Sequence, residues 1–244
     1  MEQEMNLNLQ GLGGVYASRR ELVYARHGMV CTSQPLAAQG GLDALKQGGN
    51  AIDAAVAAAA TMTVVEPTSN GLGSDCFALV WIEKDRKLYG MNASGVSPMG
   101  LSYETVEAAG GMQMRGWMPV MVSGAPAGWQ ALTERFGRRT LSQNVEGAAW
   151  YAETGYPVEP TCAKDWAASF VHFDRLMREQ APSWLSPWFE TFAPEGLLRQ
   201  VGVKQPRRSV AHLIVCLGCC RGCAQEDGQR AHGRGGEAYY LDFF

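Results

Sequence analysis

The residue type most able to do chemistry in this sequence is cysteine, and four of the seven cysteines fall between Cys216 and Cys223. They form two Cys-x-x-Cys pairs with His212 and His232 nearby, which are the side-chain types of a zinc site. The two pairs are adjacent, whereas zinc ribbons separate theirs by about 15–20 residues so that the chain can wrap the metal. We therefore expect an accidental cluster, with no metal and no cofactor; a small zinc module remains the alternative.

The other three cysteines, Cys31, Cys76 and Cys162, lie in apolar stretches. A cysteine nucleophile needs a partner that removes its proton, which in most such enzymes is a histidine. The available histidines, His27 and His172, occur in unrelated sequence contexts. Because free cysteine is among the most buried residue types, the sequence predicts three buried thiols.

A glycine-rich loop over residues 68–75 is the second chemistry-bearing feature, and it contains Asn70, Gly71, Gly73, Ser74 and Asp75. Backbone amides of such a loop can shape an active site, but glycine and asparagine also favour any tight turn. A nucleotide-binding loop would follow a strand and open a helix, and this loop does neither. A turn between helix and hairpin is the simpler interpretation of its residues.

The loop follows the strongest helix of the sequence, residues 51–62, which are nearly all alanine and apolar residues. Asn50 can cap this helix, and Asp53 stands in the first turn, where the helix dipole favours a negative charge. A helix with so little polar surface must be buried. A preceding helix is predicted from Ser33, as capping hydroxyl, and Pro35 to the glycines at 48 and 49.

After the loop, residues 77–82 and 88–92 predict a β-hairpin around a charged turn. Three tryptophans, Trp166, Trp184 and Trp188, predict packing of the later helices. The order of elements predicts an α/β or α+β fold. Further strands are expected at residues 22–25, 29–31 and 120–122, and further helices at residues 127–136, 141–154 and 166–179.

The composition bounds the class of protein. The 244 residues are 46% hydrophobic and 18% charged, which is typical of a globular chain. A net charge of −3 argues against nucleic-acid and anionic-membrane binding. The acidic, polar N-terminus has no signal-peptide pattern, so a soluble cytoplasmic protein is expected.

Residues 28–92 resemble the start of the gamma-glutamyltranspeptidase family. The most specific match is Gly48-Gly49-Asn50-Ala51-Ile52-Asp53-Ala54-Ala55, and the resemblance extends over residues 18–194. Within the family, the sequence looks most like the transpeptidase-like acylases. The other matching stretches are residues 28–33, 37–45, 64–77, 122–129, 136–138 and 151–158.

The resemblance implies an N-terminal-nucleophile hydrolase with an α+β fold, the αββα sandwich. Such an enzyme cleaves its own precursor into a large and a small subunit, and a threonine at the start of the small subunit is the nucleophile. The acyl group of an acyl amide, gamma-glutamyl in the transpeptidases, passes through a threonyl ester to water or an amine. Backbone amides hold the tetrahedral anion, and the loop with Asn70, Gly71, Gly73, Ser74 and Asp75 lies near this site.

Two departures from the family pattern concern chemistry. The Thr-Thr-His type motif has no counterpart, so the sequence predicts an incomplete sandwich, large-subunit part only, that is inactive alone and partners the small subunit. Ser94 stands where transpeptidases carry an arginine for the glutamyl α-carboxylate, and a hydroxyl cannot replace that charged fork. Asn92 and Ser94 are the expected substrate contacts.

The organisation predicted from this is a lead-in at 1–18, a large-subunit region at 19–195 and a divergent, possibly frameshifted tail at 196–244. Residues 201–244 of this tail contain 6 basic and 4 acidic residues, and the match returns only at Gly235–Tyr240. Three interpretations stay open: a glutathione-type transpeptidase or hydrolase, a cephalosporin-acylase-like amidase, and an inactive scaffold or truncated product.

Overall fold

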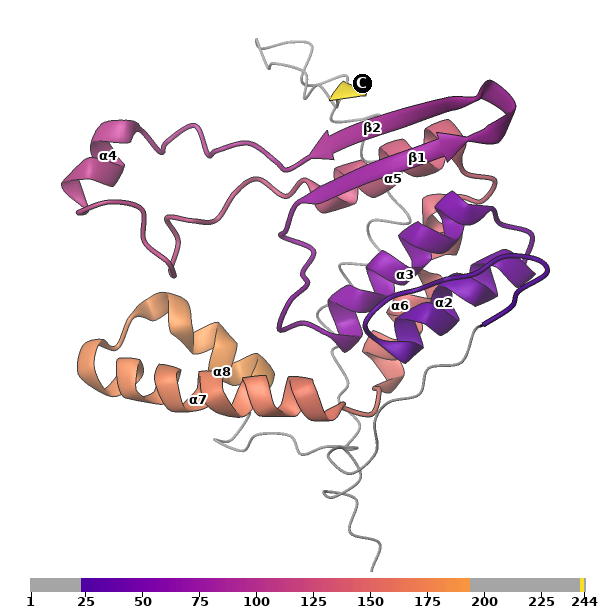
Figure 1. Ribbon diagram of the computed structural model, residues 1–244. Coiled ribbons are helices and arrows are strands. Elements are labelled where there is room, and N and C mark those ends of the chain that lie inside the picture. The colour runs from indigo at the N-terminus through magenta and orange to yellow at the C-terminus, as the bar shows by residue number, and fades with distance from the viewer. Residues whose placement is uncertain (1–22, 194–241, 244) are drawn as a thin grey trace, which may run out of the picture.

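The structure, a computed structural model, describes residues 23–193 and 242–243 (Figure 1). It has the α+β composition that the sequence predicts. The elements in chain order are α2 (Pro35–Lys46), α3 (Ala51–Val65), β1 (Cys76–Ile82), β2 (Lys87–Ala93), α4 (Tyr103–Ala108), α5 (Ala125–Phe136), α6 (Leu141–Thr154), α7 (Pro160–Gln180), α8 (Ser186–Phe192) and β3 (Asp242–Phe243).

The alanine-rich helix α3 is the centre of the fold, as predicted. Asn50 caps it by accepting from the amides of Ile52 and Asp53, and the Asp53 side chain accepts in return from the Asn50 amide. The helix packs against α2, α5 and α6. Its apolar residues join the core, which includes Val56, Val64 and Val65. A helix without a polar face is stable here because neighbours cover most of its surface.

Helix α2 has the expected span but a different cap. Gln34, and not Ser33, is the N-cap residue, and its side-chain oxygen accepts from the amides of Leu36 and Ala37. The predicted capping hydroxyl of Ser33 instead donates to Glu66 Oε2 at 2.8 Å. A contact between residues 33 positions apart thus replaces the local one.

The predicted hairpin is confirmed. Strands β1 and β2 pair antiparallel from Cys76 opposite Ala93 to Ile82 opposite Lys87, and β3 pairs with the outer edge of β2. One face of the hairpin lies on α5, where Val80 and Met91 are buried. The other face is bare and apolar, with Phe77, Leu79, Trp81 and Leu88 between 53% and 78% exposed.

Three strand predictions are wrong: residues 23–25, 29–31 and 120–122 form no strand, and residue 22 lies outside the described residues. Their apolar, β-branched composition suits a strand, but a strand also needs a neighbour with which to exchange hydrogen bonds. Residues 23–25 and 29–31 have no such neighbour in the described part of the chain, and residues 120–122 share with the segment opposite them a single backbone hydrogen bond, from the Val122 amide to the Val96 carbonyl.

The later helices are close to prediction. Helix α6 has the predicted bounds, α5 starts two residues earlier, and α7 starts six residues earlier because Pro160 at its first turn and the Glu159 cap define its beginning. Helices α4 and α8 are short and were not predicted. The three tryptophans pack as expected: Trp166 is buried against Phe192, and Trp184 and Trp188 contact Phe173.

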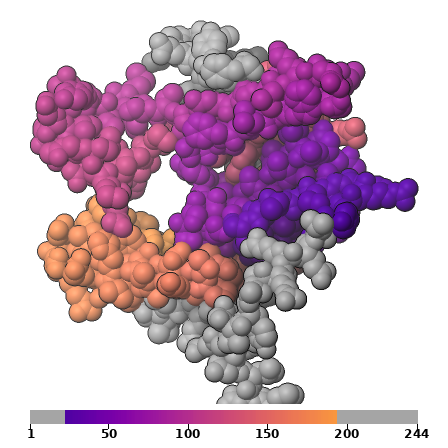
Figure 2. Space-filling view, in the orientation of Figure 1, coloured from indigo at the N-terminus to yellow at the C-terminus, as the bar shows by residue number. Residues whose placement is uncertain are grey.

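Residues 94–124 leave the hairpin as a long excursion that carries α4. Its two ends meet in a neck, where the Val122 amide donates to the Val96 carbonyl at 3.0 Å. Its far part bends toward α7 and α8, and the Arg115 guanidinium lies 5.9 Å from the centre of the Phe173 ring. Figure 2 shows the opening that this excursion encloses with the helices.

Candidate active-site region

The glycine-rich loop is anchored at its start by Glu66, the C-cap of α3. The Glu66 carbonyl accepts from the backbone amides of Ser69 and Asn70, and the Asn70 side chain also reaches Glu66. The Glu66 carboxylate accepts from Ser33 as well. Glu66 therefore joins the loop to the segment before α2. The sequence did not predict this role, because Glu66 stands before Pro67 and was interpreted only as the end of a helix.

The second half of the loop is a turn closed by Ser74. Its amide donates to the Gly71 carbonyl at 3.2 Å, and its hydroxyl donates to the same oxygen. The Ser74 carbonyl in turn accepts from the Ala125 amide at 2.9 Å, which fixes the loop to the first residue of α5. Ser74 thus shapes the backbone, as the simpler interpretation of the loop predicts.

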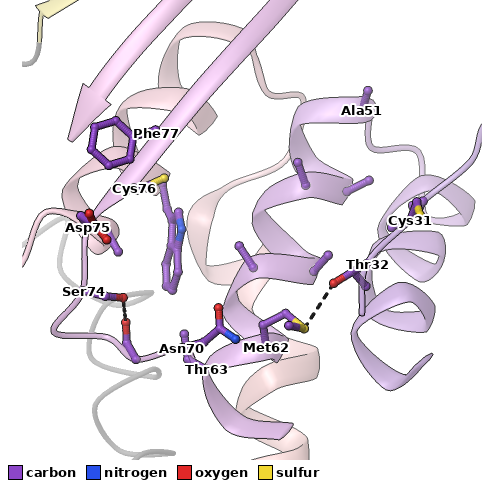
Figure 3. A pocket seen from close by; sticks show the side chains of 18 of the residues that line it. Cys31, Thr32, Ala51, Met62, Thr63, Asn70, Ser74, Asp75, Cys76 and Phe77 are labelled. Atoms are coloured by element: carbon purple, nitrogen blue, oxygen red, sulfur yellow. Dashed lines mark hydrogen bonds between the residues drawn. The ribbon is translucent and has the colours of Figure 1, made fainter. Parts of the chain in front are cut away.

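Beside the loop lies a hollow of about 540 Å³, which we call the slot (Figure 3). One wall is formed by residues 29–32 and the other by residues 74–77. The floor is the alanine face of α3 with Met62 and Thr63, and Ala125 and Trp129 of α5 also line the slot. Four of the five predicted loop residues, Asn70, Gly71, Ser74 and Asp75, line it, whereas Gly73 does not.

The two predicted substrate contacts lie outside the slot. Asn92 is exposed on β2 opposite Phe77, and its side-chain oxygen accepts from the Ser94 amide at 3.0 Å. Ser94 directly follows Ala93, the partner of Cys76 in the sheet. Its hydroxyl donates weakly to the Gly95 carbonyl at 3.4 Å. The structure therefore brings Ser94 to the end of the hairpin at which the glycine-rich loop joins β1. The Asn92 side chain is instead bonded to the backbone amide of Ser94.

The charge of this region is negative. Among the described residues that line the slot, Asp75 is the one carboxylate, and none is a lysine, arginine or histidine. Burial and the nearby Asp75 carboxylate raise the pKa of the Cys76 thiol. Both effects disfavour a thiolate, so the slot does not activate Cys76 as a nucleophile.

The prediction of three buried thiols is correct in part. Cys162 is buried, Cys76 is half-buried, and Cys31 is exposed in the wall of the slot. Cys31 lies in the segment 29–31, which was predicted as a strand but forms none. No neighbouring strand therefore covers it in the described part of the chain. Neither His27 nor His172 lines the slot.

The paired cysteines 216–223 with His212 and His232 lie outside the described residues. Within residues 23–193 and 242–243, no three His, Cys, Asp or Glu side chains gather as a metal site would require. No helix in the same part of the chain is long and apolar enough to cross a membrane.

Comparison with known proteins decides the family. The family model for gamma-glutamyltranspeptidase matches residues 37–217, which is most of the chain. The chain belongs to the gamma-glutamyltranspeptidase family. The resemblance seen in the sequence is thereby confirmed, and the match runs beyond residue 195, where the predicted large-subunit region ends.

The relatives that the chain matches include proteins named as hydrolase proenzymes. A glutathione hydrolase-like proenzyme of Bacillus subtilis is 35% identical over 131 residues, and the oxamate amidohydrolase proenzyme of Klebsiella pneumoniae is 38% identical over 141 residues. The alignments cover 53% and 54% of this chain but only 25% and 26% of those proteins. The chain therefore spans about a quarter of the length of these relatives.

Solved structures similar to this chain include a cephalosporin acylase and a gamma-glutamyltranspeptidase. Cephalosporin acylase from Bacillus halodurans is 44% identical with a TM-score of 0.75, and the match covers 94% of this chain and 45% of the acylase chain. The gamma-glutamyltranspeptidase of Helicobacter pylori, 22% identical with a TM-score of 0.73, shares the fold. More than half of the acylase chain has no counterpart in this chain.

Proposed function

We propose that this chain is the large-subunit scaffold of an enzyme that transfers or hydrolyses the acyl group of small acyl amides. Residues 19–195 form that scaffold, and a small subunit from the same precursor supplies the N-terminal threonine nucleophile. The observation that carries the proposal is the family match over residues 37–217, together with the loop and Ser94 at one end of the hairpin.

The bare face of the hairpin supports the partner. Phe77, Leu79 and Trp81 alternate along β1 on the side away from α5, and all three are more than half exposed. An apolar sheet face of this kind needs a second layer, because water contact with it is unfavourable. A second sheet laid on this face would complete an αββα sandwich.

The first candidate for the acyl group is gamma-glutamyl, because the chain belongs to the gamma-glutamyltranspeptidase family. A specific observation favours a second candidate, an acyl group without an α-carboxylate. Ser94 offers only a hydroxyl at the position of the transpeptidase arginine, and Asp75 adds a negative charge at the same end of the hairpin. A carboxylate placed there would lose a bidentate ion pair and meet a like charge.

The test is complementation. The chain is co-expressed with the part of the Bacillus halodurans acylase that it does not match, starting at a threonine, and the complex is assayed with gamma-glutamyl- and butyryl-p-nitroanilide. Turnover of either substrate by the complex, and by neither chain alone, is the expected result. A complex that turns over neither substrate contradicts the proposed activity.

The matched variant is Ser94→Arg. If the α-carboxylate position is as the family suggests, this variant increases kcat/KM for gamma-glutamyl-p-nitroanilide at least tenfold relative to the butyryl substrate, about 1.4 kcal/mol of transition-state binding. Ser97→Arg, three residues further along the exposed part of the same segment, is the control and leaves the ratio unchanged.

A further inference from the structure

A second hollow lies between helices α2 and α6. Both helices pack on α3 but contact each other only slightly, and between them is a cavity of about 380 Å³, which we call the groove. Residues of α2 and α6 line it, together with Ala57 and Thr61 of α3. It shares no lining residue with the slot. The groove is therefore separate from the candidate active-site region.

Two carboxylates line the groove, one from each of its helical walls. Asp43 is half-buried on α2, and its Oδ1 atom accepts from the side chains of Gln39 and Lys46 at 2.6 and 3.2 Å. Its Oδ2 atom accepts no hydrogen bond from the described residues. The carboxylate of Glu146, exposed on α6, forms no hydrogen bond or ion pair within the same part of the chain. Carboxylate oxygens from both walls are therefore available to a cation.

A guanidinium lines the same groove. Arg139 directly precedes the cap of α6, and its Nε and Nη2 atoms donate to Asn144 Oδ1 at 3.0 Å and to the Gln143 carbonyl at 2.8 Å. Both acceptors are neutral, and no ion pair joins Arg139 to a carboxylate of the described residues. These two bonds fix the orientation of the guanidinium and leave its Nη1 end for an anion.

Two aromatic rings of α6 complete the lining. Trp150 is 56% exposed, and the centre of its ring lies 5.0 Å from that of Tyr151, at an angle of 70°. Burial, and then the Asp43 carboxylate across the groove, raise the pKa of the Tyr151 hydroxyl. That hydroxyl is therefore neutral at pH 7 and can donate a hydrogen bond. The exposed Trp150 ring offers an apolar surface for a ligand side chain.

The two signs of charge in the groove indicate the class of ligand. Gln143, to which Arg139 is bonded, and Glu146 are three residues apart on α6, which is about 5 Å along the helix axis. A simple cation would be repelled by Arg139, and a simple anion would be repelled by Asp43 and Glu146. A zwitterion with its two charges a few ångströms apart meets a partner at each end.

We propose that the groove binds a free α-amino acid with an apolar or aromatic side chain. Its ammonium group lies between Asp43 and Glu146, its carboxylate pairs with Arg139, and its side chain packs on Trp150. Such a ligand joins α2 to α6, which contact each other only slightly without it. The site goes beyond the proposed function, because it shares no residue with the slot or the hairpin.

Calorimetry with three related compounds tests both charge contacts. The 244-residue chain is titrated with L-phenylalanine, with 2-phenylethylamine, which lacks the carboxylate, and with 3-phenylpropionate, which lacks the ammonium group. L-Phenylalanine is expected to bind, and each of the other two to bind at least about tenfold more weakly. Either compound binding as tightly as L-phenylalanine overturns recognition of a zwitterion, and so does an absence of binding by all three.

A charge variant places the binding in the groove. Glu146→Gln keeps the size of an exposed side chain that forms no bond, so the circular dichroism spectrum is unchanged, while the dissociation constant for L-phenylalanine rises at least about tenfold. Glu153→Gln removes an exposed carboxylate about two turns further along α6, outside the groove, and is expected to bind as the unmodified chain does. Equal affinity in the two variants contradicts the site.

A variant that fills the groove provides a second measurement. Gly147 lines the groove, and a β-carbon added there meets no atom within 4 Å, so Gly147→Leu fits the folded chain and improves helix propensity. It is expected to abolish binding of L-phenylalanine, whereas Ala168→Leu at an exposed position of α7 leaves binding unchanged. Binding that survives in Gly147→Leu overturns the inference. The acyl-transfer activity is measured separately, by complementation, so neither result decides the other.

Discussion

Asp53 and Asn144 are 91 positions apart, and the Asn144 side-chain amide donates to Asp53 Oδ1 at 3.0 Å in the buried interior. The same carboxylate accepts from the backbone amides of Asn50, Arg138 and Arg139 at 2.8 to 3.2 Å. One buried side chain thus caps α3 and holds the turn between α5 and α6. Its charge is compensated entirely by hydrogen-bond donors.

Replacing this carboxylate is expected to destabilise the chain. Asp53→Ala leaves the Asn144 amide and the amides of residues 138 and 139 without an acceptor, and the free energy of unfolding falls by about 2–4 kcal/mol. Urea denaturation followed by circular dichroism measures this change. The control is Asp43→Ala, which removes a solvent-exposed ion pair with Lys46 and costs less than about 1 kcal/mol. Equal losses in the two variants would show that Asp53 has no special role.

The same carboxylate gives the chain an acid-sensitive stability. Burial alone raises the pKa of Asp53, but the hydrogen bonds from Asn144 and from the three amides outweigh it, and the net pKa is lowered. A carboxyl with a lowered folded pKa stabilises the fold above its unfolded pKa, about 3.9, and this contribution is lost as pH falls through the folded pKa. The stability difference between wild type and Asp53→Asn should therefore be constant from pH 7 to 5 and shrink below about pH 4. A difference that grows on acidification would contradict the assignment.

The neck of the excursion depends on Gly124. A β-carbon at this position would collide with the Ala93 carbonyl oxygen and the Gly95 amide, both of which are backbone atoms. Gly124→Ala should thus lower the free energy of unfolding by about 1–3 kcal/mol, as an overpacked position does. Gly100→Ala, at a position with open space around it, is expected to stay within about 0.5 kcal/mol of wild type. Thermal denaturation of the two variants measures this difference, and equal midpoints for both would contradict the role of Gly124.

Two helical glycines should respond with opposite signs. Gly147 lies in α6 with open space around its missing side chain, so Gly147→Ala is expected to stabilise the helix by about 0.5–1 kcal/mol. Gly128 lies in α5 against the hairpin, where an added β-carbon would come within 2.9 Å of the Ala93 β-carbon. Gly128→Ala should destabilise the chain despite the same gain in helix propensity. Denaturation midpoints that move in the same direction would refute the packing of α5 on the hairpin.

The Cys162 thiol should be unreactive in the folded chain. Burial raises its pKa, and the neighbouring carboxylates of Glu159, Glu66 and Asp165 act in the same direction. Its sulfur lies 3.7 Å from Thr68 Oγ1, in the interior. Labelling at pH 7 should be at least about tenfold slower than at exposed Cys31. In denaturant the two rates should become equal, and a difference that persists there would point to the local sequence rather than to the fold.

The sequence alone determined the features that depend on neighbours a few residues away. The cap at Asn50, the hairpin around residues 83–86 and the bounds of α6 were all predicted, because each is fixed by side chains within one turn or one strand pair. The burial of α3 was predicted too, since a helix without polar residues has no face suited to water. The family resemblance could also be recognised from the sequence, because it rests on a contiguous motif at residues 48–55.

Tertiary structure decided the features that depend on distant partners. Ser33 was predicted to cap a helix and instead bonds Glu66, while Gln34 takes the cap. Residues 29–31 have the sequence of a strand, but β-structure requires a second backbone within hydrogen-bonding distance, and the described chain provides none there. Strand formation is a property of two segments, whereas helix formation is largely a property of one. That difference explains why the long helices followed from the sequence, and why the slot beside Cys31 became visible only in the folded chain.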